Sequence, residues 1–187
     1  ERVIRYAFEL CRKRDKKKKL TLVDKANAIR AMDIWTRVFE EVGQEYPDIE
    51  RDHAYVDAAC MWLIKSPEAF DTVVTSNLFG DIITDLSAMI QGGMGIAASG
   101  NIHPGKVSMF EPIHGSAPKY KGKGVSCPLA AIAGMQMLLD FLGEKEAADR
   151  IAVAMASLVD DGTIKSFDAK SGLSTADCGD LVVSRLK

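Results

Sequence analysis

Two aspartates, four residues apart, are the first place where this sequence could do chemistry. Asp81 and Asp85 lie in residues 75–87, where an apolar run ending at Thr75 predicts a strand and the apolar-periodic segment after it predicts a helix. On a helix this spacing places both carboxylates on one face, where like charges repel. A divalent cation would offset the repulsion, and carboxylates are typical ligands of Mg²⁺ and Mn²⁺. A helix N-terminus that favours acidic side chains is the other interpretation, and both stay open.

Polar residues follow two further apolar strands in the same way. Lys25 comes after the strand that ends at residue 23, and Asp57 comes after the one that ends at residue 56. Ligands of open α/β sheets bind at the carboxyl ends of the strands, so Lys25, Asp57, Asp81 and Asp85 are candidates to converge. An amine beside metal-bound carboxylates acts as a fixed counter-charge, or as a base if its pKa is lowered. Taken singly, each residue is better explained as a solvated strand end; their recurrence favours a site.

The elements that must position these residues alternate between strand and helix. Apolar periodicity predicts helices over residues 1–14, 28–46, 57–66, 78–90, 129–142, 145–159 and 176–186, and strands over 20–23, 53–56, 72–75 and 106–110. This alternation indicates an α/β architecture with substantial parallel pairing.

A glycine-rich stretch over residues 92–105 is the largest change of composition and the expected domain boundary. Gly93, Gly95 and Ala98 match a relaxed dinucleotide fingerprint, but the match follows a helix and opens none, so we interpret it as a flexible connection. Gly115, in the loop before the helix that Pro128 opens, is the better candidate for a backbone that approaches a phosphate.

Composition limits the possible partners. The chain has 187 residues, 47% of them hydrophobic and 27% charged, and a net charge of −2 gives no electrostatic reason to expect nucleic acid or an anionic membrane. Its four cysteines have no zinc-like spacing. Without a signal peptide or a long apolar span, a cytoplasmic location is expected. The helical start without an initiator Met suggests part of a longer chain.

At these positions the sequence resembles the β-decarboxylating dehydrogenases, the family of 3-isopropylmalate and isocitrate dehydrogenases. The matching motifs are Asp-Lys-Ala-Asn at 24–27, Val-Asp-Ala-Ala at 56–59, Asn-Leu-Phe-Gly-Asp at 77–81 with Asp85, and Glu-Pro-Ile-His-Gly-Ser-Ala-Pro at 111–118. The first is most similar to isopropylmalate members. The resemblance implies the C-terminal half of an isopropylmalate dehydrogenase-like α/β fold. Residues 1–91 would complete the dimerisation and substrate domain, and residues 92–187 the cofactor-binding domain.

The family's site residues carry over to matching positions. The resemblance implies that Asp57, Asp81 and Asp85 bind Mg²⁺ or Mn²⁺, and that Lys25 and Asp57 serve catalysis in the partner's site of a homodimer. The expected reaction is the oxidative decarboxylation of a 2-hydroxy acid, 3-isopropylmalate first, with isocitrate, homoisocitrate and tartrate as alternatives. The residues expected to bind NAD or NADP are Asn27, Glu111, His114, Gly115, Ser116, Ala117, Lys119, Tyr120 and Cys127.

Two departures leave the choice of cofactor open. Lys119 stands where NAD-using relatives usually have an Asp that binds the ribose hydroxyls, and with Tyr120 it resembles NADP-dependent isocitrate enzymes. No residues of 164–170 match the Tyr and Arg that complete that NADP site. Cys127 replaces a common Asn that contacts adenine. A non-catalytic dimeric subunit or fragment remains the alternative, and the 187-residue piece alone is expected to be inactive.

Overall fold

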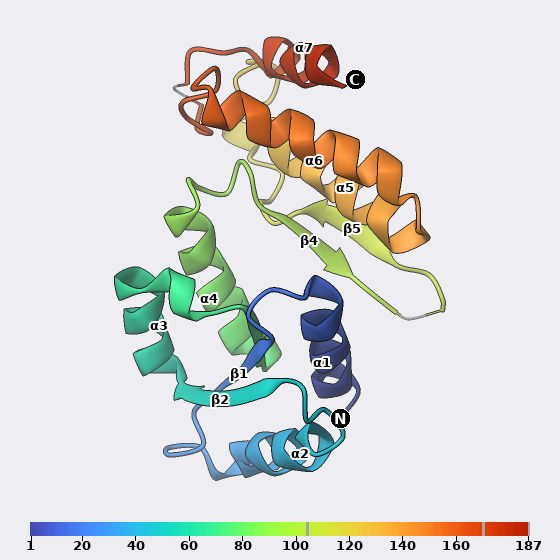
Figure 1. Cartoon of the computed structure of the whole chain (residues 1–187). Helices are drawn as coiled ribbons and strands as arrows, with labels where there is room; N and C mark the ends of the chain where they lie inside the picture. Colours follow the sequence, from blue (N-terminus) through green and yellow to red (C-terminus); the bar gives the residue numbers. More distant parts are fainter. Residues whose placement is uncertain (104, 170, 187) are drawn as a thin grey trace. The chain divides into compact units, whose positions relative to one another are not determined.

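A three-stranded parallel sheet organises the first part of the chain (Figure 1). Its strands are β1 (Lys19–Asp24), β2 (Glu50–Tyr55) and β3 (Thr72–Thr75), in the order β2-β1-β3. The central strand β1 is buried from Leu20 to Asp24, as expected of a parallel strand covered on both faces. Asp24 pairs in register with Tyr55, and Val23 pairs with Thr75. The carboxyl ends of all three strands therefore meet at one edge.

Helices cover both faces of this sheet (Figure 1). The short η1 (Arg30–Met32) and α2 (Asp33–Gly43) connect β1 to β2, and α3 (Val56–Lys65) with η2 (Pro67–Ala69) connects β2 to β3. The two crossovers run in opposite directions along the sheet, and because such crossovers are right-handed, α2 and α3 belong to opposite faces. The chain opens with α1 (Arg2–Arg14), and α4 (Asn77–Ile90) follows β3.

The core of this region lies between the sheet and the helices α1 and α2. Phe8 is fully buried there, and its ring stacks on those of Phe39 and Tyr46 at centroid distances of 5.4 and 4.7 Å. The other buried members are Ile4, Ala7, Cys11, Leu20, Leu22, Val42, Ile49 and Val74. Leu20 and Leu22 are alternate residues of β1, so their side chains point to the same face of the sheet, the face that the helices cover.

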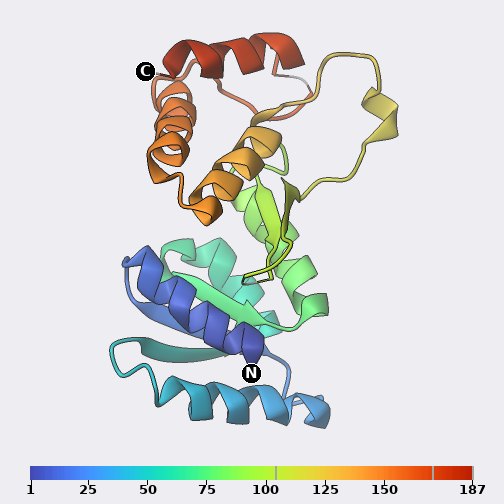
Figure 2. The ribbon, with the colours of Figure 1, turned by 90° about the vertical axis from the view of Figure 1, so that its right-hand side faces the viewer.

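The second part of the chain is built from a hairpin and three helices. The strands β4 (Ala98–Asn101) and β5 (Met109–Pro112) pair antiparallel, and α5 (Leu129–Leu142) packs on both. The helix α6 (Lys145–Asp160) packs on α5, and α7 (Thr175–Arg185) packs on α6. Between β5 and α5 the chain makes a long excursion that carries the short η3 (Pro118–Tyr120) (Figure 2).

This computed structural model describes residues 1–103, 105–169 and 171–186. Contacts divide the chain into two compact units, Glu1–Ser87 and Ala88–Lys187, and α4 continues past the boundary. The assignment of residues 1–91 and 92–187 to dimerisation and cofactor-binding domains stays a prediction. No helix among the described residues is both long and apolar enough to span a membrane.

The α/β fold with a parallel sheet flanked by helices is confirmed. Three local expectations were wrong. The strand expected over 106–110 begins only at Met109, and its partner β4 lies inside the stretch interpreted as a connection. The helix expected from residue 28 begins as η1 at Arg30, because a turn first closes on Lys25. Val56 opens α3 instead of ending β2.

Candidate active site

Lys25 and Asp57 form an ion pair at the carboxyl edge of the parallel sheet. Lys25 begins the turn after β1, Asp57 lies in the first turn of α3, and Lys25 Nζ is 2.7 Å from Asp57 Oδ2. The Lys25 side chain is 22% exposed and that of Asp57 is 68% exposed, so the amine is the more enclosed partner. The hydrogen bond from the Lys25 amine is the main reason that the pKa of Asp57 lies below its usual value. The two residues predicted to serve catalysis are therefore together in one chain.

The ring of Tyr55 supports this ion pair. Lys25 Nζ lies 5.9 Å from the centre of the ring, within the range of a cation–π contact. Tyr55 is the last residue of β2, and His53, two positions earlier on the same strand, packs edge-on against it at 5.1 Å. From the motif at 24–27, only Lys25 and Asn27 were predicted as site residues. Asp24, His53 and Tyr55 were missed, because in the sequence they look like ordinary strand residues.

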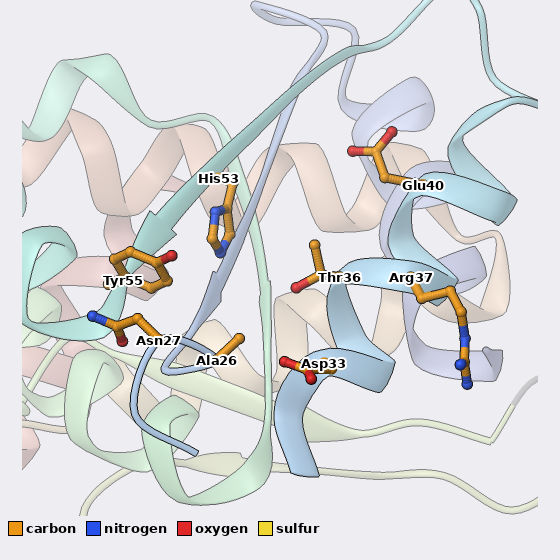
Figure 3. A pocket seen from close by; sticks show the side chains of 8 residues that line it. All are labelled: Ala26, Asn27, Asp33, Thr36, Arg37, Glu40, His53 and Tyr55. Carbon is orange, nitrogen blue, oxygen red and sulfur yellow. The ribbon is translucent and has the colours of Figure 1, made fainter. Parts of the chain in front are cut away.

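A pocket of about 570 Å³ opens beside the turn that carries Lys25 (Figure 3). One wall is the turn and the end of β2, and the other is the polar face of α2. Figure 3 shows the Arg37 guanidinium directed away from His53. The lining residues are Ala26, Asn27, Asp33, Thr36, Arg37, Glu40, His53 and Tyr55. Of the predicted site residues, Asn27 belongs to this pocket.

Asp81 and Asp85 lie one turn apart on α4 and are both exposed. Asn77 Nδ2 donates to Asp81 Oδ2 over 3.4 Å. Across the ranges that the structure describes, neither carboxylate pairs with a Lys or Arg side chain, and no three His, Cys, Asp or Glu residues are grouped so as to hold a metal ion. The predicted metal site draws Asp57 from a second subunit, so one chain does not test it. The donor set of Asp81 and Asp85 fits a hard divalent cation.

The predicted cofactor residues of the second unit lie along β5 and the excursion after it. Glu111, on β5, is exposed and accepts a 3.4 Å hydrogen bond from Asn101 Nδ2 on β4. His114 Nδ1 lies 2.9 Å from the carbonyl oxygen of Gly115. Gly115 and Ser116 are exposed. These side chains and backbone groups are open to a ligand.

A tight turn then presents Lys119. Ala117 adopts a left-handed conformation (φ 43°), and its carbonyl accepts a 2.9 Å hydrogen bond from the Tyr120 amide. Lys119 Nζ lies 4.8 Å from the centre of the Tyr120 ring. Lys119 is exposed, so its positive charge is open to an anionic group.

Cys127 lies just before α5, packed against the core of the second unit. Thr175 Oγ1, at the start of α7, donates to the neighbouring Ser126 carbonyl over 2.7 Å. The buried Cys178 of α7 also meets Cys127. Burial first, and then this second thiol, raise the pKa of Cys178 to about 11.

Comparison with known proteins places the chain among dehydrogenases. A family model described as isocitrate/isopropylmalate dehydrogenase matches residues 1–182. The 3-isopropylmalate dehydrogenase of Corynebacterium jeikeium is 45% identical over 193 residues, and that of Beutenbergia cavernae is 47% identical over 190 residues. Both matches cover 100% of this chain, but 54% and 52% of the respective relatives. The chain thus spans about half the length of the curated relatives it matches.

The solved structures that the chain matches are also dehydrogenases. The isocitrate dehydrogenase from Methylococcus capsulatus matches with a TM-score of 0.91 at 39% identity, over 99% of this chain and 55% of that one. A β-decarboxylating dehydrogenase from Thermococcus kodakarensis matches with a TM-score of 0.85 at 32% identity, over 99% of this chain and 54% of that one.

Proposed function

Because the chain belongs to the isocitrate/isopropylmalate dehydrogenase family, we propose that the full-length protein carrying it oxidatively decarboxylates a 2-hydroxy acid with NAD or NADP. The relatives named 3-isopropylmalate dehydrogenase make 3-isopropylmalate the first substrate to test, with a role in leucine biosynthesis. Isocitrate, homoisocitrate and tartrate are the alternatives.

The observation that carries this proposal is the pairing of Lys25 with Asp57 at 2.7 Å, at the sheet edge where α/β proteins bind ligands. The two residues come from different strand ends, 32 positions apart in the sequence, yet the register of β1 and β2 brings them together. An amine held beside a carboxylate is placed to take part in proton transfer at a substrate hydroxyl. Lys25 would assist removal of that proton, and Asp57 would orient the amine.

Asp57, Asp81 and Asp85 would hold Mg²⁺ or Mn²⁺. When bound, such a cation lowers the pKa of a coordinated hydroxyl and stabilises the enolate that remains after loss of CO₂. The exposed carboxylates on α4 support this assignment, since none is committed to a Lys or Arg among the described residues. Their mutual repulsion at a four-residue spacing also favours cation binding.

The loop from His114 to Tyr120 would bind the adenosine half of the cofactor, with Cys127 beside it, and Asn27 and Glu111 would line the nicotinamide end. The exposed backbone around Gly115 lets a ligand approach closely. Lys119, held over Tyr120, offers a positive charge that favours a 2′-phosphate over a ribose diol. Assays with both NAD and NADP decide between the two.

We further propose a cytoplasmic homodimer in which Lys25 and Asp57 complete the site of the other subunit. Apolar side chains on the surface of the first unit support an interface there. On α3, Met61, Trp62 and Ile64 are 70%, 46% and 67% exposed, and on α4, Leu78 and Ile82 are 66% and 51% exposed. Exposed patches of large apolar side chains are typical of protein–protein contacts.

Steady-state assays of the full-length protein test the activity. With Mn²⁺ and either nicotinamide cofactor, we expect reduction of the cofactor with 3-isopropylmalate or another 2-hydroxy acid, and loss of activity on chelation. Lys25→Met should lower kcat by about 10²- to 10⁴-fold, the usual effect of removing a group that transfers a proton. The matched control is Lys16→Met, which removes an exposed lysine from the turn after α1, away from the sheet edge that carries Lys25. No turnover of any hydroxy acid would leave the non-catalytic subunit as the better interpretation.

Mixing two inactive variants tests the shared site. One subunit carries Lys25→Met and the other Asp85→Asn. If Lys25 crosses to the partner, each mixed dimer holds one site with both residues intact and one with neither. Random mixing then restores about a quarter of the wild-type activity, since half of the dimers are mixed and each has one working site. Absence of recovery would show that each subunit uses its own Lys25.

A further inference from the structure

We infer that Asp24 and His53 are positioning residues that set the place of Lys25. This inference rests on the proposed function, in which Lys25 acts at the substrate hydroxyl. Asp24 ends β1 directly before Lys25, and its carboxylate is almost fully buried, at 1% exposure. A buried carboxylate is retained only where hydrogen bonds replace its lost hydration. The groups that supply those bonds show what Asp24 holds in place.

The first donor lies in the turn itself. The backbone N–H of Ala26 donates to Asp24 Oδ1 over 3.0 Å, which closes a turn around Lys25. The carbonyl of Lys25 in turn accepts the N–H groups of Ala28 and Ile29 over 3.0 and 2.9 Å. The backbone of Lys25 is thus fixed from both sides, by Asp24 before it and by the turn after it.

The other two donors come from the two elements that enclose the pocket. Thr36 Oγ1, on α2, donates to Asp24 Oδ2 over 3.1 Å. His53 Nε2, on β2, lies 3.1 Å from Asp24 Oδ1. Asp24 therefore connects the turn that bears Lys25 to both walls of the pocket (Figure 3). Three partners from three different segments thus hold the Asp24 carboxyl group at this junction.

His53 carries the connection on to the side chain of Lys25. It packs edge-on against Tyr55, and the Tyr55 ring lies beneath Lys25 Nζ. One buried carboxylate thereby orders the backbone of Lys25 directly and its amine through two aromatic rings. His53 is 35% exposed, and it lines the pocket together with Thr36 and Tyr55, so a ligand there would meet this chain of contacts.

The test compares two buried carboxylates at opposite edges of the same sheet. Asp71 precedes β3, its side chain is also 1% exposed, and it accepts hydrogen bonds from Arg14 Nε and the Lys17 amide over 3.2 and 3.1 Å. Asp24→Asn and Asp71→Asn make the same chemical change at equal burial. Both should lower the melting temperature of the full-length protein. Only Asp24→Asn should lower kcat, by about 10- to 100-fold for a displacement of the amine of up to 1 Å, with KM for the hydroxy acid almost unchanged.

A second pair of variants keeps the test valid if Asp24→Asn does not fold. His53→Gln keeps a donor that can reach Asp24, whereas His53→Leu removes it from a half-exposed site that tolerates substitution. We expect the Leu variant to lose about tenfold in kcat and the Gln variant to recover most of that loss. If the His53→Leu and His53→Gln variants were both as active as the wild type, the inference would be overturned.

Hydrogen exchange of the Ala26 amide supplies a readout that needs no turnover. Its protection should fall in Asp24→Asn and stay unchanged in Asp71→Asn, in the protein without ligands. Unchanged Ala26 protection in Asp24→Asn would overturn the inference even in an active enzyme. A wild type that turns over no hydroxy acid, but shows the expected exchange, would instead overturn the proposed function and leave the structural link between Asp24 and the turn intact.

Discussion

Replacing Phe8 with Leu should destabilise the first unit more than truncating an exposed side chain of the same helix to Ala. Phe8 is fully buried and stacked between Phe39 and Tyr46 at interplanar angles of 21° and 10°. Leu keeps most of the aliphatic contact but loses both ring contacts. Each aromatic pair contributes about 0.5–1.5 kcal/mol beyond the buried area, so the two together predict a loss of about 2 kcal/mol.

Tryptophan fluorescence can follow this loss. Both tryptophans of the chain, Trp35 and Trp62, lie in the first unit, and Trp35 packs against the cluster that contains Phe8. In urea, unfolding of a small unit has an m-value of about 1–3 kcal/mol/M, so a loss of about 2 kcal/mol in Phe8→Leu should move the midpoint down by about 0.7–2 M. The control is Leu10→Ala on α1, where the side chain is 37% exposed and the expected loss is below about 1 kcal/mol. An equal shift for both variants would refute the stacked core as the main contact of α1.

Three other predictions concern sterics, charge and thiol reactivity. Gly95→Ala would place Cβ 2.2 Å from the Phe167 carbonyl oxygen, so it should destabilise the second unit by about 1–3 kcal/mol in thermal denaturation followed by circular dichroism. Lys25→Met should raise the pKa of Asp57 towards about 3.9 in a carboxyl NMR titration, because the amine is what chiefly lowers it. In the wild type, the stabilisation from this pair is complete above the unfolded pKa and is lost as pH falls through the folded pKa. Cys178, with a pKa of about 11, should react with iodoacetamide at pH 8 about two orders of magnitude more slowly than an ordinary thiol.

Each of these has a matched control in the chain. Gly179→Ala on α7 meets nothing within 4 Å and should be neutral or slightly stabilising. Lys65→Met should leave the Asp57 titration unchanged. Cys60, only partly buried on α3, should be alkylated well before Cys178. A stable Gly95→Ala protein, an unmoved Asp57 titration in Lys25→Met, or a fast Cys178 would each contradict the corresponding contact.

Local sequence signals were sufficient to predict the bounds of an element whose own residues begin and end it. The helix predicted over 129–142 has those bounds in α5, because Pro128 precedes it and Gly143, at φ 88°, takes up the left-handed conformation that ends it. Signals were insufficient for β4, whose residues Ala-Ser-Gly-Asn have little strand preference and pair only because β5 lies beside them. Its formation depends on a contact that no local pattern encodes.

In the candidate site, too, some residues were predictable from the sequence and others were not. Lys25 and Asp57 were predictable from strand ends, because parallel strands bring those ends together. The role of Asp24 was not, since burial of its carboxylate depends on donors 12 and 29 positions away in the sequence. For Asp81 and Asp85, the reason that the sequence-based prediction stays untested is different. Their expected third ligand belongs to another subunit, so the metal site stays a prediction.

The exposed apolar side chains on α3 and α4 have a consequence for how this protein responds to dilution. If association covers Trp62, Ile64 and Leu78, part of the free energy that holds the first unit together comes from a bimolecular step. The melting temperature then rises with protein concentration, and dilute samples lose activity by dissociation before any helix unfolds. Comparisons between variants are meaningful only at one fixed subunit concentration.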